Sequence, residues 1–152
     1  MRARIDKIVG NFLVLLMAVI TLDVLWGVFT RYILGDQASW SEELARFLLI
    51  WIGVLGAAYA SGQRMHLAID LLGPKLEPHK HRRLQRFIDL LILLFALSVL
   101  LVGGLRLLYI TQVLGQLSPS LRVPMAVVYS VLPISGLLIV YYKILDIQAK
   151  EI

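Results

Sequence analysis

The sequence predicts an all-α integral membrane protein, a four-helix bundle with both termini in the cytoplasm. Hydrophobic residues make up 59% and charged residues 16% of the 152 residues, with a mean hydropathy of +0.82. A soluble domain averages roughly 45–50% apolar and about 25% charged residues. The apolar residues also gather in four continuous runs, which excludes the alternating pattern of a membrane β-barrel. We expect a single membrane domain over residues 1–152.

Each run approaches the length that a membrane helix requires. About 20 mostly apolar residues suffice, because each rises about 1.5 Å and the hydrocarbon core is about 30 Å thick. The predicted spans are about 8–30, 42–61, 87–109 and 125–142. The first is longer than the apolar part of a signal peptide and lacks a clear cleavage site, so we expect an uncleaved span. The last contains Pro133, and Pro124 suits its first turn.

The distribution of basic residues predicts the orientation. The two tails and the connection between the second and third spans hold eleven Lys and Arg, whereas the first and third connections hold only Arg31 and Arg122. The positive-inside rule therefore places both tails and the second connection in the cytoplasm. There we expect residues 65–76 to lie at the membrane interface. We expect the following basic side chains to contact anionic lipid headgroups, which fits a sequence this apolar better than nucleic-acid binding does: Lys80, Arg82, Arg83 and Arg86.

The sequence offers little catalytic chemistry. His66, His79 and His81 fall in the second connection without an acidic cluster, and the His79–His81 spacing does not place two ligands on one helical face. There is no cysteine, no glycine-rich phosphate loop and no recognisable serine–histidine–acid motif. We predict no enzyme activity, no cofactor and no metal site.

Asp23 is the most informative charge within a span. It lies seven residues before Thr30, hence about 10 Å inside the outer boundary. A carboxylate at such depth costs about 3 kcal/mol on insertion scales unless it is paired or protonated. We expect it to pair with Arg106 of the third span or with a partner subunit. The alternative is a proton or ion relay.

The start of the second span carries several polar residues and has two interpretations. Ser39 and Glu42 have the spacing of a capping box, and both Glu42 and Glu43 can form local ion pairs with Arg46. One interpretation is a capped helix end at the membrane interface. The other is an exposed docking surface for another protein, formed together with Trp40.

The second span also contains closely spaced small residues. Gly53 with Ala57, and Gly56 with Ala60, have the small-xxx-small spacing that lets helices approach closely. Trp51 falls near mid-membrane, where its N–H needs an acceptor within the protein. These features predict helix packing, either within the chain or between chains.

Several short motifs occur along the chain in a characteristic order and spacing. They are Phe29–Gly35 (FTRYILG), Trp40–Arg46 (WSEELAR), Trp51, Gly56–Ala58 (GAA), His66–Asp70 (HLAID), Gln116–Leu121 (QLSPSL), Pro124, Tyr129 and Pro133. Together they resemble the small membrane subunit of TRAP transporters, the tripartite ATP-independent periplasmic transporters, in the DctQ-like small permease family. The resemblance covers most of the chain and includes the number and spacing of the spans.

This resemblance implies a three-part system in a bacterial or archaeal inner membrane. A periplasmic solute-binding protein captures an organic acid, and a large membrane subunit carries it inward with sodium ions in an elevator-like motion. The small subunit binds the large one as part of its stationary scaffold. The residues that we expect at the partner interface are Asp23, Trp40, Glu42, Glu43, Arg46, Trp51, Gly53, Gly56 and Ala57.

Two other functions remain open. The chain could act alone as a small homo-oligomeric channel or exporter, but that would require a polar stripe along a span, and the spans show none. It could also be a structural subunit of another membrane complex. Recovery of a large permease with the tagged chain would favour the scaffold interpretation.

Overall fold

The fold consists of two long helical hairpins that pack side by side. The computed structural model describes residues 2–36, 38–63 and 78–149, and within these it contains helices and no strands. The first hairpin comprises α1 (Arg2–Phe29), its π-helical extension η1 (Thr30–Leu34), and α2 (Ser39–Gly62). The second comprises α4 (Pro78–Phe95), π-helical η3 (Ala96–Gly103) and α5 (Gly104–Val113) as one continuous helix, followed by α6 (Met125–Tyr129) and α7 (Val131–Ala149).

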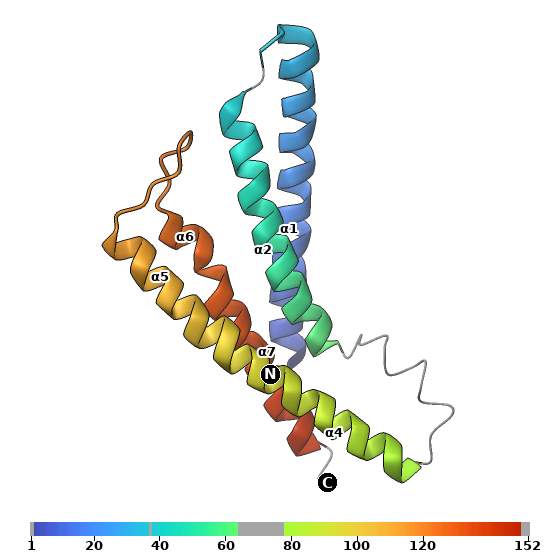
Figure 1. Cartoon of the computed structure of the whole chain (residues 1–152). Helices are drawn as coiled ribbons and strands as arrows, with labels where there is room; N and C mark the ends of the chain where they lie inside the picture. The colour runs from blue at the N-terminus through green and yellow to red at the C-terminus, as the bar shows by residue number, and fades with distance from the viewer. Residues whose placement is uncertain (1, 37, 64–77, 150–152) are drawn as a thin grey trace.

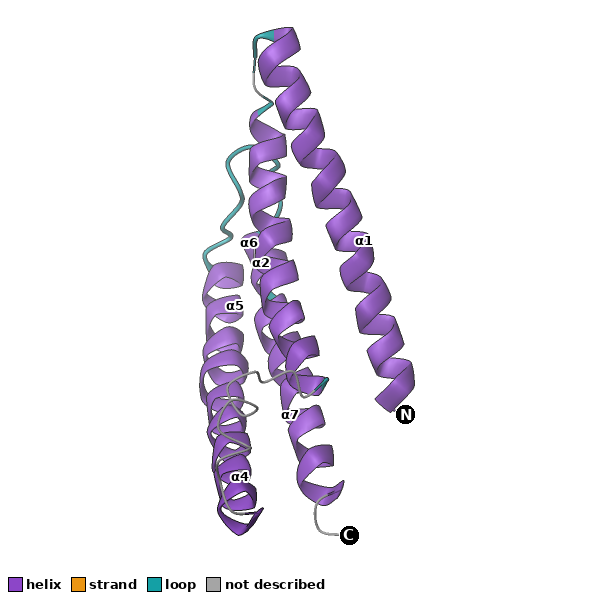
Figure 2. Ribbon diagram, turned by 90° about the vertical axis from the view of Figure 1, so that its right-hand side faces the viewer, coloured by secondary structure: helices purple, strands orange, loops and turns teal. Residues whose placement is uncertain are grey.

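The two hairpins meet at one end and diverge at the other (Figure 1). We call the end that carries both termini the closed end, and the end that carries the α1–α2 and α5–α6 connections the open end. In Figure 2, α2 lies between α1 and the α6–α7 pair, so α1 is at the edge of the bundle. Both termini lie at the same end, as an even number of crossings requires. That this end is cytoplasmic stays a prediction from the charge distribution.

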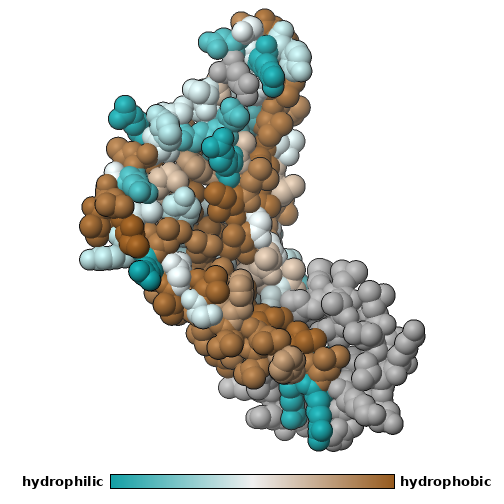
Figure 3. Space-filling model, viewed as in Figure 1, coloured by the Kyte–Doolittle hydropathy of each residue, from teal (hydrophilic) through white to brown (hydrophobic). Residues whose placement is uncertain are grey.

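The prediction of four apolar helices is confirmed. The helical segments long and apolar enough to cross a membrane are Arg2–Leu34, Ser39–Gly62, Arg83–Val113 and Met125–Asp146, each extending beyond the run predicted from sequence. Most of their large hydrophobic side chains face outward. Hydrophobic residues accordingly cover the middle of the visible surface, and hydrophilic ones gather towards its ends (Figure 3). Such an exterior suits lipid or a membrane partner and does not suit water.

Two small clusters of buried residues hold the hairpins together. Leu16 of α1 and Leu55 of α2 pack with Val131 of α7. Closer to the closed end, Ala58 of α2 packs with Ala96 of η3 and Ile139 of α7. Both clusters include α2 and α7, so these two helices form the centre of the bundle.

Pro133 explains why the last span is interrupted. Helix α6 follows Pro124, whose φ of −59° suits a helix start, but it ends at Tyr129 and α7 begins at Val131. Proline has no N–H, so the carbonyl of Tyr129, four residues earlier, has no helical donor. The predicted continuous span is therefore two helices separated at Ser130.

Close approach between the spans depends on glycines that the small-residue motif did not single out. A Cβ added at Gly62 would lie 2.6 Å from the Tyr142 ring, and one at Gly136 would lie 3.0 Å from Leu100 Cβ. At Gly104 it would lie 2.9 Å from Leu132 Cβ and 3.1 Å from the backbone nitrogen of Pro133. By contrast, a Cβ at Gly53 would meet nothing within 4 Å.

We expect Gly104→Ala to destabilise the isolated chain by about 1–3 kcal/mol, because the added methyl group overpacks a contact that includes backbone. The matched substitution Gly53→Ala should be neutral or slightly stabilising, since alanine favours helix by about 1 kcal/mol over glycine. Unfolding of both purified variants in detergent measures the difference between their free energies of unfolding. Equal stability of the two variants would contradict the close approach at Gly104.

Candidate functional site

Glu43 joins the open ends of the two hairpins. Its Oε2 accepts hydrogen bonds from the backbone N–H of Ser120 at 3.0 Å and of Leu121 at 2.7 Å. The hydroxyl oxygens of Ser39 and Ser120 lie 3.1 Å apart beside this contact. Glu43 is only 9% exposed. Its carboxylate therefore holds the α5–α6 connection against α2 and is largely hidden from a partner.

The local contacts predicted at the start of the second span are wrong. Ser39 is already within α2, whose N-cap is Ala38 with no side-chain cap, so Ser39 and Glu42 do not form a capping box. In the described part of the chain, neither Glu42 nor Glu43 forms an ion pair with Arg46. Exposed pairs gain little from association, whereas the two backbone donors compensate Glu43 for its burial.

Asp23 is buried against the start of α2 and does not meet Arg106. Ser41 Oγ donates to Asp23 Oδ1 at 2.8 Å and approaches the Asp23 carbonyl oxygen at 3.1 Å. Gly27 permits this approach, because a Cβ there would lie 3.2 Å from Ser41 Oγ. Arg106 is exposed on α5. The predicted Asp23–Arg106 contact is wrong because the hairpins diverge at this level, which leaves α2 and not α5 beside α1 (Figure 1).

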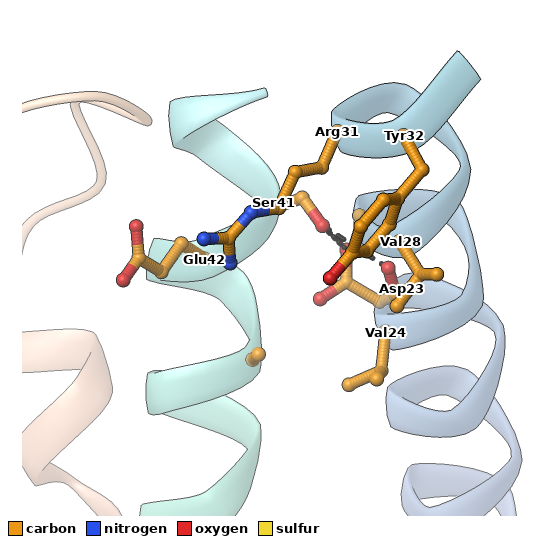
Figure 4. A pocket seen from close by; sticks show the side chains of 9 residues that line it. Asp23, Val24, Val28, Arg31, Tyr32, Ser41 and Glu42 are labelled. Atoms are coloured by element: carbon orange, nitrogen blue, oxygen red, sulfur yellow. Dashed lines mark hydrogen bonds between the residues drawn. The ribbon is translucent and has the colours of Figure 1, made fainter. Parts of the chain in front are cut away.

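A groove opens beside Asp23 between α1 and α2 (Figure 4). Its volume is about 290 Å³, and it is lined by Asp23, Val24, Gly27, Val28, Arg31, Tyr32, Ser41, Glu42 and Ala45. In Figure 4 the Arg31 side chain extends toward Glu42, while Ser41 points at Asp23. The groove therefore combines a buried carboxyl group at its base with charged side chains at its mouth.

The indole N–H of Trp51 has a hydrogen-bond acceptor within the protein, as predicted from its position in the sequence. Its Nε1 donates to the carbonyl oxygen of Val128 in α6 at 3.1 Å. Its ring also meets Phe12 of α1 edge-on, with centroids 6.2 Å apart. Trp51 thus fastens α2 to both neighbours, and its side chain is half-buried within the bundle.

One face of α2 stays uncovered along most of its length. Residues spaced by three or four positions are exposed on it, and we call this face the α2 stripe: Glu42, Arg46, Leu49, Gly53 and Ala57. Gly56 borders the stripe, and Cβ atoms added at Gly53 or Gly56 would meet nothing within 4 Å. Gly53 and Gly56 are therefore not positions of close helix packing within the described part of the chain. Trp40 is 42% exposed on another side of α2.

A polar cluster at the closed end was not expected. Arg2 Nη1 donates to Asp146 Oδ1 at 2.8 Å, and Tyr142 Oη donates to Asp6 Oδ1 at 2.5 Å. Arg2 also contacts the Gly62 carbonyl. These contacts join α1 to α2 and α7. Arg2, counted as a tail residue from sequence, belongs to the helix, and the periodic apolar pattern gave no sign of its partners.

The expected lipid-facing basic residues are described only in part. Arg83 and Arg86 are exposed on α4, as a headgroup contact requires. The side chains of Lys80 and Arg82 lie outside the described residues, as do those of His79 and His81. The expected interfacial segment, residues 65–76 with His66, also lies outside them. The headgroup contact stays a prediction.

Comparison with known proteins identifies the family. The family model for the DctQ component of tripartite ATP-independent periplasmic transporters matches residues 11–148. The chain belongs to this family. It is a multi-pass membrane protein, and the DctQ-family resemblance noted from its motifs is confirmed.

Relatives of this DctQ-family chain are permease proteins of TRAP transporters. It is 29% identical to the sialic acid TRAP transporter small permease protein SiaQ of Vibrio cholerae over 68% of this chain and 60% of that protein. It is 26% identical to a putative TRAP transporter small permease protein of Haemophilus influenzae over 89% of this chain and 82% of that protein. It is 33% identical to the isethionate TRAP transporter permease protein DctMQ of Oleidesulfovibrio alaskensis over 64% of this chain, which is 15% of that protein.

Proposed function

We propose that this DctQ-family chain is the small scaffold subunit of a TRAP transporter in a bacterial or archaeal inner membrane. It binds the large membrane subunit and supports sodium-coupled uptake of an organic acid that a periplasmic solute-binding protein delivers. The chain supplies a fixed apolar surface to this complex and no reactive group.

The uncovered α2 stripe carries this proposal. It lies on a central helix of the bundle, yet Gly53 and Ala57 are exposed and Gly56 has open space beside it. In a membrane, such small residues allow a second helix to approach closely. At the open end the same stripe presents Glu42 and Arg46, which can orient a partner through polar contacts. Glu43 and Trp51 support this face from within, by holding α2 to the second hairpin and to α6.

The relative from Oleidesulfovibrio alaskensis supports a large membrane partner. Its name is permease protein DctMQ, and the segment similar to this chain makes up 15% of its length. A DctQ-like segment is therefore found covalently joined to a much longer permease. This similarity supports an association between the present chain and such a permease.

The relatives also support an acidic substrate. Two carry sialic acid and isethionate in their names, and both compounds are organic acids. No polar stripe crosses the described spans of this chain that could itself select a solute. The subunit that binds the solute and the subunit that moves it are therefore the other two components.

Co-purification of the tagged chain with the large permease expected to be encoded beside it tests the scaffold function. We expect Gly53→Leu to reduce recovery of the large subunit on the order of ten-fold, because leucine fills the space that a partner helix would use. The matched control is Gly103→Leu, at another exposed glycine with only the Ser98 carbonyl nearby, at 3.7 Å.

Three results would decide against the proposal. One is recovery of the wild-type chain without any large permease, and another is conduction of solute by the chain alone in vesicles, as expected of a homo-oligomeric channel. Loss of recovery in Gly103→Leu but not in Gly53→Leu would move the interface away from the α2 stripe. Sodium-dependent uptake of an organic acid is measured in vesicles that contain all three components.

A further inference from the structure

One carboxyl oxygen of Asp23 lacks a hydrogen-bond partner in the part of the chain that the structure describes. The residue is 6% exposed, and Oδ1 accepts the hydrogen bond of Ser41. Oδ2 is completely buried and has no hydrogen-bond partner among the described residues. A buried polar atom without a partner is costly in any protein and more so at membrane depth. Such an atom points to a ligand.

The groove beside Asp23 has room for that ligand. Its volume of about 290 Å³ exceeds the space of a single water molecule. Val24, Val28 and Ala45 supply apolar walls, whereas Glu42 and Arg31 lie at the mouth. With two carboxyl groups and one guanidinium group, the groove suits a positively charged donor on an apolar stem.

A free metal ion fits these residues poorly. Within the described residues, no group of three or more His, Cys, Asp and Glu side chains could hold one. The Ser41 hydroxyl already directs its proton to Asp23, which leaves few oxygen ligands for a hard cation. A guanidinium or ammonium side chain needs fewer protein oxygens, because it brings its own donors to Oδ2 and its methylene groups to the apolar walls.

We propose that the Asp23 groove receives an arginine or lysine side chain from a transmembrane helix of the large membrane subunit. Glu42 belongs both to the wall of the groove and to the α2 stripe. A helix that lies on the stripe therefore passes the mouth of the groove, and its basic side chain reaches Asp23 Oδ2. This inference rests on the proposed scaffold function and names the chemistry of the partner.

Asp23→Asn tests the inference in the assembled complex. Asparagine keeps an oxygen that accepts from Ser41 but removes the charge that binds the basic side chain. We expect the large subunit to dissociate about ten-fold faster or more from the variant in detergent, as for loss of a hydrogen bond to a charged group. The unfolding midpoint of the isolated chain should not change. Asp36→Asn, which removes an exposed carboxylate just after η1, outside both the groove and the α2 stripe, is the matched control and should change dissociation less than three-fold.

A photo-crosslinking amino acid at Val28 provides a second measurement. We expect it to join the chain to the large subunit, and to do so less in Asp23→Asn. The same crosslinker at Leu137, which is 59% exposed on α7, should not depend on Asp23. The adduct identifies the partner helix, and reversal of its basic residue to Glu should restore the complex with Asp23→Lys.

Other occupants would give different results and overturn the inference. Unchanged dissociation in Asp23→Asn, with the wild-type complex intact, would refute it while leaving the scaffold function standing. An equal effect of Arg31→Gln and Asp23→Asn, without crosslinking at Val28, would make Arg31 of the same chain the occupant. An Asp23-dependent rise of the isolated chain's unfolding midpoint in sodium, relative to choline, would make the occupant a free ion. Failure of the wild-type chain to bind the large subunit refutes the scaffold function itself.

Discussion

Lys143→Met is expected to lower the free energy of unfolding by about 3–5 kcal/mol, as when one partner of a buried ion pair is removed. Lys143 Nζ donates to Asp89 Oδ1 at 3.0 Å, and the two residues are 1% and 6% exposed. The pair joins α7 to α4 near the closed end. In the variant, the Asp89 carboxylate faces a thioether in place of an ammonium group, with little access to water. Unfolding of the purified chain in detergent, followed by tryptophan fluorescence, measures the loss.

A double variant separates the ion pair from the packing around it. Replacing both residues, as Lys143→Met with Asp89→Leu, should recover most of the stability, because neither charge of the pair then remains buried without the other. The matched control is Arg86→Gln, which removes an exposed basic residue from α4 and should change stability by less than about 0.5 kcal/mol. A loss below about 1 kcal/mol in Lys143→Met would contradict the structural role of the pair.

The four helices were predictable from sequence because a membrane-spanning helix is recognised by the overall apolar composition of its whole length. Burial of backbone polar groups in lipid requires helices regardless of which neighbours they have. The number of basic residues in each connection likewise needs no contact information. The count of basic residues misplaces Lys143. This residue was assigned to the cytoplasmic tail, but it lies inside α7 and donates a hydrogen bond to Asp89.

Side-chain partners were not predictable, because sequence distance is a poor guide to contacts between spans. The predicted partners of Glu43 lie within a few residues of it, but its actual partners, Ser120 and Leu121, are 77 and 78 residues away. Asp23 and Arg106 were predicted to pair because they lie at a similar depth in the membrane. Which spans are neighbours at that depth depends instead on how the hairpins diverge. For Trp51, the need for an acceptor was predictable, but the choice of Val128 depended on the fold.

The small-residue motif likewise predicted some features of the packing and missed others. It marked Gly53 and Gly56 in α2, which the chain itself leaves uncovered. It missed Gly62, Gly104 and Gly136, where the close contact comes from a large group on another span. A small-residue motif within one helix indicates that another helix can pack closely against it. Which helix approaches, and whether it belongs to the same chain, depends on shapes that the motif does not contain.

Glu43→Ala is expected to lower the free energy of unfolding by about 2–3 kcal/mol and to separate the open ends of the hairpins. The substitution leaves the backbone N–H groups of Ser120 and Leu121 without their acceptor, and each such loss costs about 1–3 kcal/mol when the site is shielded from water. The closed end should stay intact, because the contacts of Arg2 and Tyr142 there are independent of Glu43.

Distance measurement can detect this separation directly. The chain has no cysteine, so cysteines introduced at exposed Leu49 of α2 and exposed Leu114, just beyond α5, can carry spin labels. Double electron–electron resonance should give a longer and broader distance distribution in Glu43→Ala, and an unchanged one in Glu42→Ala, where the neighbouring carboxylate is exposed. Identical distributions in the two variants would show that Glu43 does not hold the hairpins together.

The same pair of variants links the fold to the proposed scaffold. If Glu43 acts by holding α2 at a fixed position relative to the second hairpin, Glu43→Ala should weaken co-purification of the large subunit although Glu43 is itself 9% exposed. Glu42→Ala removes a side chain from the α2 stripe and should weaken binding without widening the distance distribution. A loss of binding that follows the spin-label distance therefore reports on the position of α2, and a loss without a distance change reports on direct contact.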